Sequence, residues 1–578
     1  MAGFDDRRQS LEVDFSSGAQ IPLAGGSGQT AATQALASAA YRDGPVSDLV
    51  AINDETKVKS PKLSLFEPNL GEAFARAVQV RMLGGGRKPL IQSFGADPLT
   101  VADHCLAASR IRKARDVQLT IVMVLFGILF LPGVLLWLAG FQLRRTLAGV
   151  QSRLTSGGAV ANVAKVVGFA KLAKLTGAAS MVGLLALLGL AALVFAGAVL
   201  LPAGGLLLLY LLAMPVAPII GWLWAKRICE RYAKDLRGFW SALLGGGGVG
   251  ARIPEAVPQD PNDEGARKLR EALIQVAAEQ NSNVVFYAGP KGILGMGTRW
   301  GSWHLAEELT PAKGVDDINP FRSWDVVRAI EDRLRMLERT PLHTGGFPKP
   351  SIRHWIVAPV GEGAKDVSRP GGQVVDSYTV KDFEVQRICN EQQFGSGNRH
   401  YLGVQFVLWD GQLVLTMMIT VTVLHHTLRI EVTGHALGPV HGLFTTKPSP
   451  KEKEVARHIK FWETKKVPLP LVEAKEVVRL TARAPLTWFP PVLDFFGGKV
   501  SLPEPFGLRH TWAAPPWRHR FMADDALRAA TPVLRVVHAA ALKVLEDNGV
   551  DTERFGNRSQ FLSGQVQAHV PNKADEYL

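Results

Sequence analysis

The chain has 578 residues, a formal net charge of +13 and a mean hydropathy of +0.09. Its length predicts more than one folding unit. The three cysteines, Cys105, Cys229 and Cys389, are far apart and form no CxxC pair, which argues against a disulfide framework and a cysteine zinc site. The basic residues gather beside apolar segments, so anionic lipid explains them better than nucleic acid does.

The N-terminal part is polar and built from small residues. Residues 1–60 contain few large apolar groups and are predicted to be a disordered tail, because they cannot bury enough surface to offset the entropy of ordering. No apolar run lies near the start, so no cleavable secretory signal is expected. Residues 61–116 are predicted to form a helical cytoplasmic segment, with helices in EAFARAVQVRML and ADHCLAASRIRKAR.

Two long apolar stretches follow. Leu119 to Leu143 holds 25 residues without a charge, enough to cross a hydrocarbon core of about 30 Å, so 117–143 is predicted to be a first transmembrane segment. Pro132 and Gly133 predict a kink there, with a re-entrant hairpin as the alternative. Met181 to Trp224 is uncharged for 44 residues and is interrupted near Pro202. Residues 181–226 therefore form either an apolar hairpin of two spans or one span with an interfacial stretch.

The flanks of these stretches are basic. Residues 144–180 are predicted to be a basic amphipathic connector on an anionic leaflet, with a solvated loop as the alternative. Residues 227–265 form a juxtamembrane segment and a flexible linker. The positive-inside rule places the N-terminus in the cytoplasm, and an even number of spans returns the C-terminal domain there. The residues predicted to lie at the membrane interface are Arg112, Lys113, Arg115, Arg144, Arg145, Trp222, Trp224, Lys226 and Arg227.

Residues 266–578 are predicted to form a soluble α+β domain with an antiparallel sheet. Helices are expected in ARKLREALIQVAAEQ, SWDVVRAIEDRLRMLERT, PKEKEVARHIKFWETKK and ADDALRAATPVLRVVHAAALKVLEDNG. Strands are expected in NVVFYAG and on both sides of Asp410-Gly411, a strong hairpin turn. The predicted fold class is thus a membrane protein with an α-helical region of two or three spans, a C-terminal α+β domain and a disordered N-terminal tail.

The candidate chemical sites are weak. The glycines between Gly289 and Gly301 follow a strand but lack a phosphate-loop pattern, so a tight turn is the better interpretation. His425, His426, His435 and His441 lie near Glu431 without metal-ligand spacing. No nucleophile elbow or catalytic carboxylate pair is found, so neither catalytic residues, nor a metal, nor a cofactor is predicted. A candidate partner surface, or alternatively an ordered loop, contains Arg509, Trp512, Trp517 and Arg518.

Two blocks carry a family resemblance: NVVFYAGPKGILGMGTRWGSWHLAEEL and YLGVQFVLWDGQLVLTMMITVTVLHHTLRIEVTGHALGPV. They resemble actinobacterial membrane proteins that combine central spans with a C-terminal soluble domain. Some of these are associated with phage-tail-like contractile injection systems, and the resemblance implies a role in recruiting the particle to the cytoplasmic membrane. It carries over no functional residue.

The predicted function is a non-enzymatic, membrane-anchored adaptor that recruits a cytoplasmic partner or complex, such as a contractile injection particle, to the cell membrane. The alternatives are a membrane-associated enzyme using the C-terminal domain and an accessory subunit of a transport assembly. The predicted partners are an anionic lipid bilayer, a protein or large cytoplasmic complex and a second copy of the chain, with no nucleic acid. The predicted location is multi-pass in the cell membrane.

Overall fold

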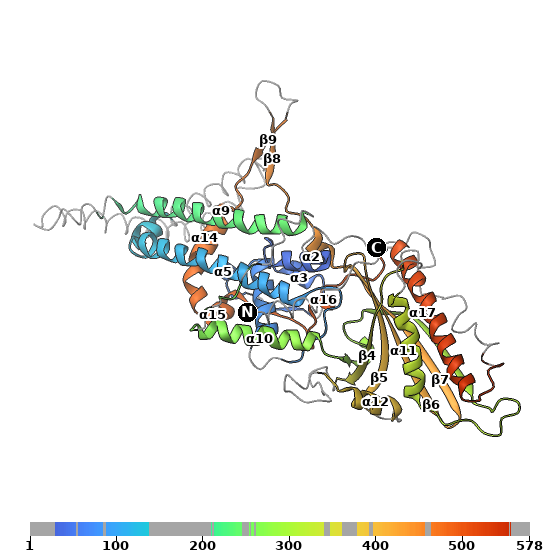
Figure 1. Cartoon of the computed structure of the whole chain (residues 1–578). Helices are drawn as coiled ribbons and strands as arrows, with labels where there is room; N and C mark the ends of the chain where they lie inside the picture. Colours follow the sequence, from blue (N-terminus) through green and yellow to red (C-terminus); the bar gives the residue numbers. More distant parts are fainter. Residues whose placement is uncertain are drawn as a thin grey trace, which may run out of the picture.

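The computed structural model describes residues 29–137, 210, 213–245, 262–339, 347–360, 379–391, 397–456, 464–518 and 520–555, apart from gaps at 54–55, 60, 85–87 and 554, together with positions 254, 256–258 and 260. Figure 1 shows two units side by side. We call the described parts of 29–280 and 438–518 the helical unit, and those of 281–437 and 520–555 the sheet unit.

The helical unit starts with a buried helix. Helix α2, Ala31–Ala39, is capped by the Thr30 side chain, which accepts a hydrogen bond from the Thr33 backbone N–H. It lies against α5 and α9, and its alanines let the helices approach closely. The predicted disordered tail is therefore wrong for the described residues after 28, because small side chains here fill a narrow space in the core. Residues 1–28 lie outside the described part of the chain.

Four longer helices make up most of this unit, and their first turns carry the expected capping residues. Helix α4, Leu70–Leu83, is capped by Asn69, and α5, Pro98–Val122, by Asp97. Helix α10, Glu264–Gln280, is capped by Asp263, whereas α9, Ala217–Leu244, has a proline in its first turn. The helices predicted in EAFARAVQVRML, ADHCLAASRIRKAR and ARKLREALIQVAAEQ are thereby confirmed.

Segments from the C-terminal half complete the helical unit. Phe74 of α4 packs against Phe444 and Trp512, with ring centroids 5.8 and 5.9 Å away, and all three side chains are buried. The N-terminal and C-terminal halves of the chain therefore share one core. The elements contributed by the later half are α13 (Gly442–Thr445), β8 (Glu452–Ala456), β9 (Thr464–Pro468), α14 (Ala474–Arg483), η7 (Ala484–Trp488), α15 (Pro490–Gly497), β10 (Val500–Ser501) and α16 (Leu508–Thr511).

The remaining short elements of this unit are α3 (Ser47–Val50), β1 (Lys57–Val58) and η2 (Ser64–Phe66), and β1 pairs with β10. The helix predicted in PKEKEVARHIKFWETKK is wrong, because β8 and β9 form an antiparallel hairpin there. That hairpin extends away from the rest of the helical unit (Figure 1).

The predicted transmembrane architecture needs correction. Helix α5 continues as the π-helix η3, Met123–Ile128, and the chain then bends by 85° before the short helix Leu131–Trp137. Within the described residues no single helix is both long and apolar enough to cross a membrane, and this bent pair meets the criteria of length and composition only when its two parts are taken together. The fold class of a membrane protein with two or three spans, and the multi-pass location derived from it, are therefore wrong for this part of the chain. Residues 138–209 lie outside the described residues, and with them the connector and most of the predicted hairpin.

The sheet unit is built on six strands in the order β2-β4-β5-β6-β7-β3. Strands β2 and β4 pair in parallel and the other neighbours are antiparallel, so the sheet is mixed rather than antiparallel throughout. The hairpin predicted at Asp410-Gly411 is confirmed, since Leu408 pairs with Leu413 across it. The bounds are β2 (Val284–Tyr287), β3 (Thr298–Glu308), β4 (Ser351–Pro359), β5 (Arg399–Leu408), β6 (Leu413–Leu424) and β7 (Thr427–Leu437).

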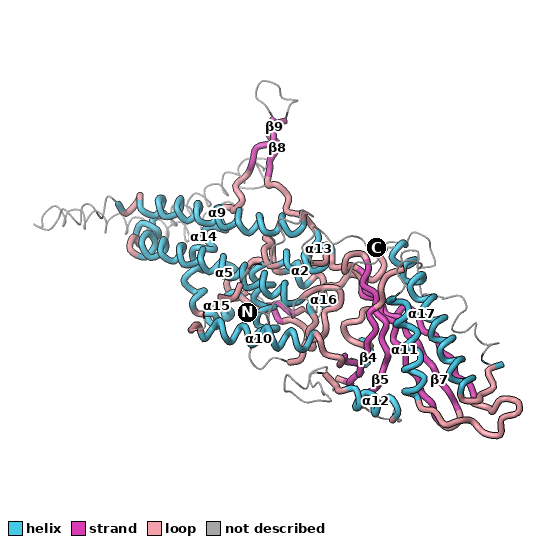
Figure 2. Tube along the Cα trace, in the orientation of Figure 1, coloured by secondary structure: helices cyan, strands magenta, loops and turns pink. Residues whose placement is uncertain are grey.

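Two long helices, α11 (Ser323–Arg339) and α17 (Arg520–Asp547), lie together over one face of this sheet (Figure 2). The helix predicted in SWDVVRAIEDRLRMLERT is confirmed, and its residues Val326, Ile330 and Leu334, which recur at helical spacing, are fully buried. The shorter helix α12, Asp382–Asn390, packs beside α11 and against β5. The unit is therefore α+β, with its main core between the sheet and these helices.

Candidate functional site

Exposed large hydrophobic side chains gather where α5 and η3 meet the start of α9. Within the described residues, 14 of the 31 exposed large hydrophobic side chains belong to residues 121–137 and 216–224. Such a concentration is unusual for a surface that faces only water. We call this surface the apolar tip. Its members are Ile121, Val124, Leu125, Ile128, Leu129, Leu131, Leu135, Trp137, Val216, Ile219, Ile220, Trp222, Leu223 and Trp224.

Close backbone approach holds the two segments of the tip together. A Cβ atom added to Gly133 would lie 2.0 Å from the Met214 carbonyl oxygen, so only glycine fits there. Similarly, a Cβ at Gly221 would lie 2.5 Å from Phe126. The Tyr210 hydroxyl also donates a hydrogen bond of 2.8 Å to the Leu129 carbonyl oxygen. The exposed side chains of the tip therefore stand on a defined scaffold.

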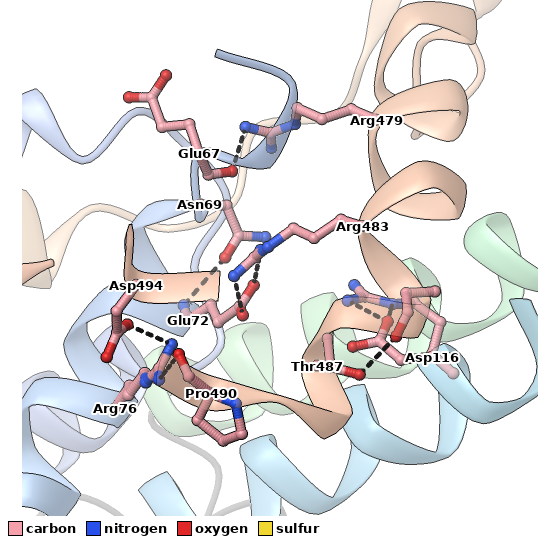
Figure 3. Close-up of polar contacts among 12 residues, drawn as sticks. Glu67, Asn69, Glu72, Arg76, Asp116, Arg479, Arg483, Thr487, Pro490 and Asp494 are labelled. Atoms are coloured by element: carbon pink, nitrogen blue, oxygen red, sulfur yellow. Dashed lines mark hydrogen bonds and ion pairs between the residues drawn. The ribbon is translucent and has the colours of Figure 1, made fainter. Parts of the chain in front are cut away.

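Behind the tip lies a small apolar layer and then a cluster of buried charges. Leu119 of α5 and Ile228 of α9 pack with Leu480 of α14. The next layer, which we call the buried charge cluster, consists of Glu72, Arg112, Arg115, Asp116 and Arg483. Figure 3 shows Arg483 of α14 reaching the Glu72 carboxylate of α4, with two hydrogen bonds of 2.5 Å. The Arg115 guanidinium bonds Asp116 at 2.8 Å.

The charges in this cluster perturb one another. Burial alone would raise the pKa of Glu72, but the charge of Arg483 and its hydrogen bonds outweigh burial and lower that pKa to about 2. Burial raises the pKa of Asp116 despite the attraction of Arg115. Burial lowers the pKa of Arg112 to about 10, and its Nη2 donates a hydrogen bond of 2.6 Å to the Ala40 carbonyl oxygen. These groups bind one another and the backbone, so their role is to fix α5 against α4 and α14.

The structure separates the residues predicted to lie at a membrane interface. Arg112 and Arg115 are buried in the charge cluster and cannot face lipid headgroups. Lys113 is exposed, with its Nζ 5.8 Å from the Trp488 ring centre, and Arg227 is exposed as well. Trp222 and Trp224 are exposed in the apolar tip, and the Nζ of Lys226 lies 5.7 Å from the Trp222 ring centre. Arg144 and Arg145 lie outside the described residues.

The candidate partner surface is mostly interior. Arg509 and Trp512 are fully buried, Trp517 is 9% exposed, and only Arg518 is exposed. The Arg509 Nη2 donates to the carbonyl oxygens of Gly411, Gln412 and Gly438, and burial lowers the pKa of Arg509 to about 9. Arg509 thus joins the helical unit to the ends of β6 and β7 and presents no surface to a partner.

The glycine-rich stretch forms a turn, as predicted. It holds the short helix η4, Gly289–Lys291, and the left-handed glycines Gly292, Gly295 and Gly297. A Cβ at Gly297 would lie 2.1 Å from the Ala436 carbonyl oxygen, so this glycine permits close packing against β7.

The four neighbouring histidines do not converge. His425 and His426 occupy the β6–β7 turn with positive φ. His435 is buried, and the His441 Nδ1 accepts the Leu443 backbone N–H at the start of α13. In the described part of the chain, no three His, Cys, Asp or Glu side chains are placed to hold a metal ion.

One polar arrangement in the sheet unit has no signal in the sequence. His354 lies between Glu331 and His400, with Nε2 3.0 Å from the Glu331 carboxylate and Nδ1 2.9 Å from the His400 Nε2. The bond to His354 lowers the pKa of Glu331 to about 2, and burial lowers the pKa of His400 to about 3. These residues come from α11, β4 and β5 and share no motif spacing. Burial of His400 and its packing near Trp324 fit a structural role.

The structure also contains two cavities that the sequence does not predict. One of about 490 Å³ lies between the start of α11 and α12, lined among others by Phe321, Arg322 and Phe383. The other, of about 200 Å³, lies between α4 and the segment after α15, where Arg76 pairs with Asp494 at 2.8 Å (Figure 3). The second is smaller than the usual range for drug-sized ligands.

Comparison with known proteins gives one match. Residues 302–572, somewhat less than half of the chain, match the family model of the AbeC-like domain. The matched stretch runs through both units, because it includes most of β3, all of β4 to β7 and also α14 to α16. No curated protein and no solved structure matches the chain.

Proposed function

We propose that this protein is a non-catalytic adaptor that binds a large protein assembly through the apolar tip. The observation that carries the proposal is the gathering of 14 exposed large hydrophobic side chains on one scaffolded end of the helical unit. An apolar surface of this extent is typical of a protein contact site. A phage-tail-like contractile injection particle is the candidate assembly, on the strength of the resemblance described above.

The charges beside the tip indicate the chemistry of the partner. Lys113 and Arg227 are exposed, and Lys226 is partly exposed, all close in sequence to the tip residues. Opposite charges around an apolar contact steer encounter and suppress wrong partners. The partner surface is therefore expected to be apolar at its centre and acidic at its rim. Contact with anionic lipid, which the sequence also predicts, would likewise use these exposed basic side chains, and it stays a prediction.

A binding experiment with a matched control tests the proposal. The full chain is mixed with purified contractile particles, and binding is measured by co-sedimentation. The tip variant is Ile128→Glu with Leu223→Glu, two residues that are 59% and 50% exposed. The control is Met336→Glu with Phe383→Glu, which are 62% and 68% exposed in the sheet unit. We expect the tip variant to lose at least tenfold in affinity and the control to bind as the unmodified chain does.

Two results would overturn the proposal. One is the absence of particle binding by the unmodified chain. The other is equal binding by the tip variant and the unmodified chain. A parallel measurement with neutral and anionic vesicles separates the partner classes: binding to vesicles alone would assign the tip to lipid contact and remove the protein partner.

A further inference from the structure

The six-stranded sheet has two edges that differ in how they are closed. Strand β2, at one edge, has only four residues. The chain returns along it, so that the Leu294 N–H donates to the Phe286 carbonyl oxygen at 2.7 Å and Ile293 forms a bridge with Tyr287. Edges that are short and covered in this way do not offer a template for another strand.

Strand β3, at the opposite edge, has 11 residues and pairs with β7 over almost its full length. Along its other side, no backbone hydrogen bond joins residues 298–308 to any segment that the structure describes. Every second residue of an edge strand directs its N–H and C=O away from the sheet, so β3 presents a row of backbone groups for pairing.

Few protective features interrupt this row. A register shift between Arg299 and Gly301 marks a β-bulge near the start of the strand. From Gly301 to Ala306 the strand has no lysine, proline or carboxylate, and the exposed side chains are Ser302, His304 and Ala306. Natural edge strands usually carry such groups to prevent pairing. Their absence from the centre of β3 suits a strand that has a partner.

The inner face keeps the edge in a fixed position. Trp300, Trp303 and Leu305 are buried on the sheet's covered face. The Trp300 ring centre lies 5.5 Å from that of Trp303 and 6.1 Å from that of Trp517, next to the start of α17. Because these large rings hold β3 against the core, its edge is preorganised, which reduces the ordering cost of pairing.

We infer that β3 pairs antiparallel with β3 of a second copy of this chain, forming one continuous sheet across a twofold axis. The charges of the strand are self-complementary. Arg299 near one end and Glu308 at the other are both exposed. Antiparallel pairing about the middle of β3 brings Arg299 of each copy near Glu308 of the other, and a twofold interface repeats that favourable contact.

Sedimentation velocity of the full chain tests the inference. The unmodified protein is expected to sediment as a species of twice the 62.7 kDa chain mass. Ser302→Lys places a lysine on the solvent face of the edge and should yield monomers with an unchanged thermal melting temperature. Ser351→Lys makes the same change at an exposed position of β4, an inner strand, and should leave the dimer intact.

Charge reversal adds a rescue arm. Arg299→Glu and Glu308→Arg each set like charges against each other and should weaken the dimer at least tenfold, whereas the double variant should restore it. The inference is overturned if the unmodified chain is a monomer, or if Ser302→Lys remains dimeric. It is also overturned if the double reversal is no better than the single ones. Dimers that survive Ser302→Lys but disappear in the Ile128→Glu and Leu223→Glu variant would assign association to the apolar tip instead.

Discussion

The helical unit and the sheet unit differ in what they bury. In the helical unit the interface of α4, α5 and α14 encloses Glu72, Arg112, Arg115, Asp116 and Arg483. In the sheet unit most of the space between the sheet and α11 is filled by aliphatic and aromatic side chains, including Ile330 and Phe406, both fully buried. The exception is the chain of Glu331, His354 and His400. Buried ion pairs recover their desolvation cost only with good geometry, whereas apolar burial needs no specific partner. The helical unit is therefore the more sensitive to single substitutions.

The difference also bears on the proposed adaptor. A partner that binds the apolar tip acts on helices that the charge cluster holds in place. Apolar packing alone would let such helices slide, because it is non-directional, but the paired Glu72 and Arg483 fix one relative position of α4 and α14. The buried charges are accordingly interpreted as positioning groups for the tip.

The largest expected effect comes from breaking the pair between Glu72 and Arg483. Glu72→Ala leaves the Arg483 side chain, which is 3% exposed, without its carboxylate partner. The expected loss is about 3–5 kcal/mol of unfolding free energy, because an uncompensated buried charge remains. Denaturant unfolding followed by circular dichroism measures the loss, and hydrogen exchange assigns it to the helical unit.

The matched control replaces both partners. Glu72→Leu with Arg483→Leu removes the charges together, and its unfolding free energy should lie within about 1–2 kcal/mol of the unmodified chain. Equal destabilisation by the single and double variants would show that the two charges are not coupled. The helical unit would then be no more sensitive to single substitutions than the sheet unit.

Acid should unfold the helical unit through two groups. The pKa of Glu72 is about 2 in the folded state, below its ordinary value of 4.5. Burial lowers the pKa of His104 from 6.5 to about 4. Because both pKa values are lower in the folded state, each group stabilises the fold at pH values above its unfolded pKa. That stabilisation is lost as the pH falls from 6.5 to 4 for His104 and from 4.5 to 2 for Glu72. At about 1.4 kcal/mol per pKa unit, each contributes at most about 3.5 kcal/mol to the unfolding free energy.

Unfolding free energies measured from pH 7 to pH 2 check this expectation. In the helical unit, the Glu72→Leu and Arg483→Leu double variant should lose the part of the pH dependence below 4.5 and keep the part between 6.5 and 4. Glu331, whose pKa is also lowered to about 2, keeps a dependence below 4.5 in the sheet unit. Stability that does not change from pH 7 to pH 4 would contradict the assignment to His104. The buried His400 and His435 also have lowered pKa values, so hydrogen exchange is needed to resolve the two units.

Local patterns predicted much of the sheet unit. Val326, Ile330 and Leu334 recur at helical spacing and identify α11 directly. Asp410 and Gly411 have φ values of 54° and 78°, a conformation that their residue types favour, so the hairpin could be read from two residues. The parallel pairing of β2 with β4 could not be predicted from local patterns, because it depends on which distant strand lies beside β2.

The helical unit was much harder to predict because its contacts are distant in sequence. The hydrogen bonds between Glu72 and Arg483 span 411 positions, so no spacing rule reveals them. Basic residues before an apolar run suggested a membrane flank, yet Arg112 and Arg115 are buried. Helix α2 was missed since alanines give a weak apolar signal and become core only where α5 and α9 enclose them. The tip residues themselves were recognised as apolar and a kink was predicted at Pro132 and Gly133, but the close packing of this segment against Met214 and Gly221 was not predicted.

The smallest expected losses of unfolding free energy come from removing one capping contact in the helical unit and one methyl group from the core of the sheet unit. The Asp97 carboxylate accepts the backbone N–H groups of Leu99 and Thr100, at 2.9 and 3.3 Å, at the start of α5. Asp97→Ala should cost about 1 kcal/mol, because those donors lose their partner and the carboxylate no longer favours the positive end of the helix. Ile330→Val in α11 should also cost about 1 kcal/mol, by leaving a small cavity in an apolar core.

Denaturant unfolding at low and high salt distinguishes the two substitutions: screening should reduce the cost of Asp97→Ala and leave that of Ile330→Val unchanged. Equal salt responses would mean that electrostatics contributes no more to the start of α5 than to the core of the sheet unit.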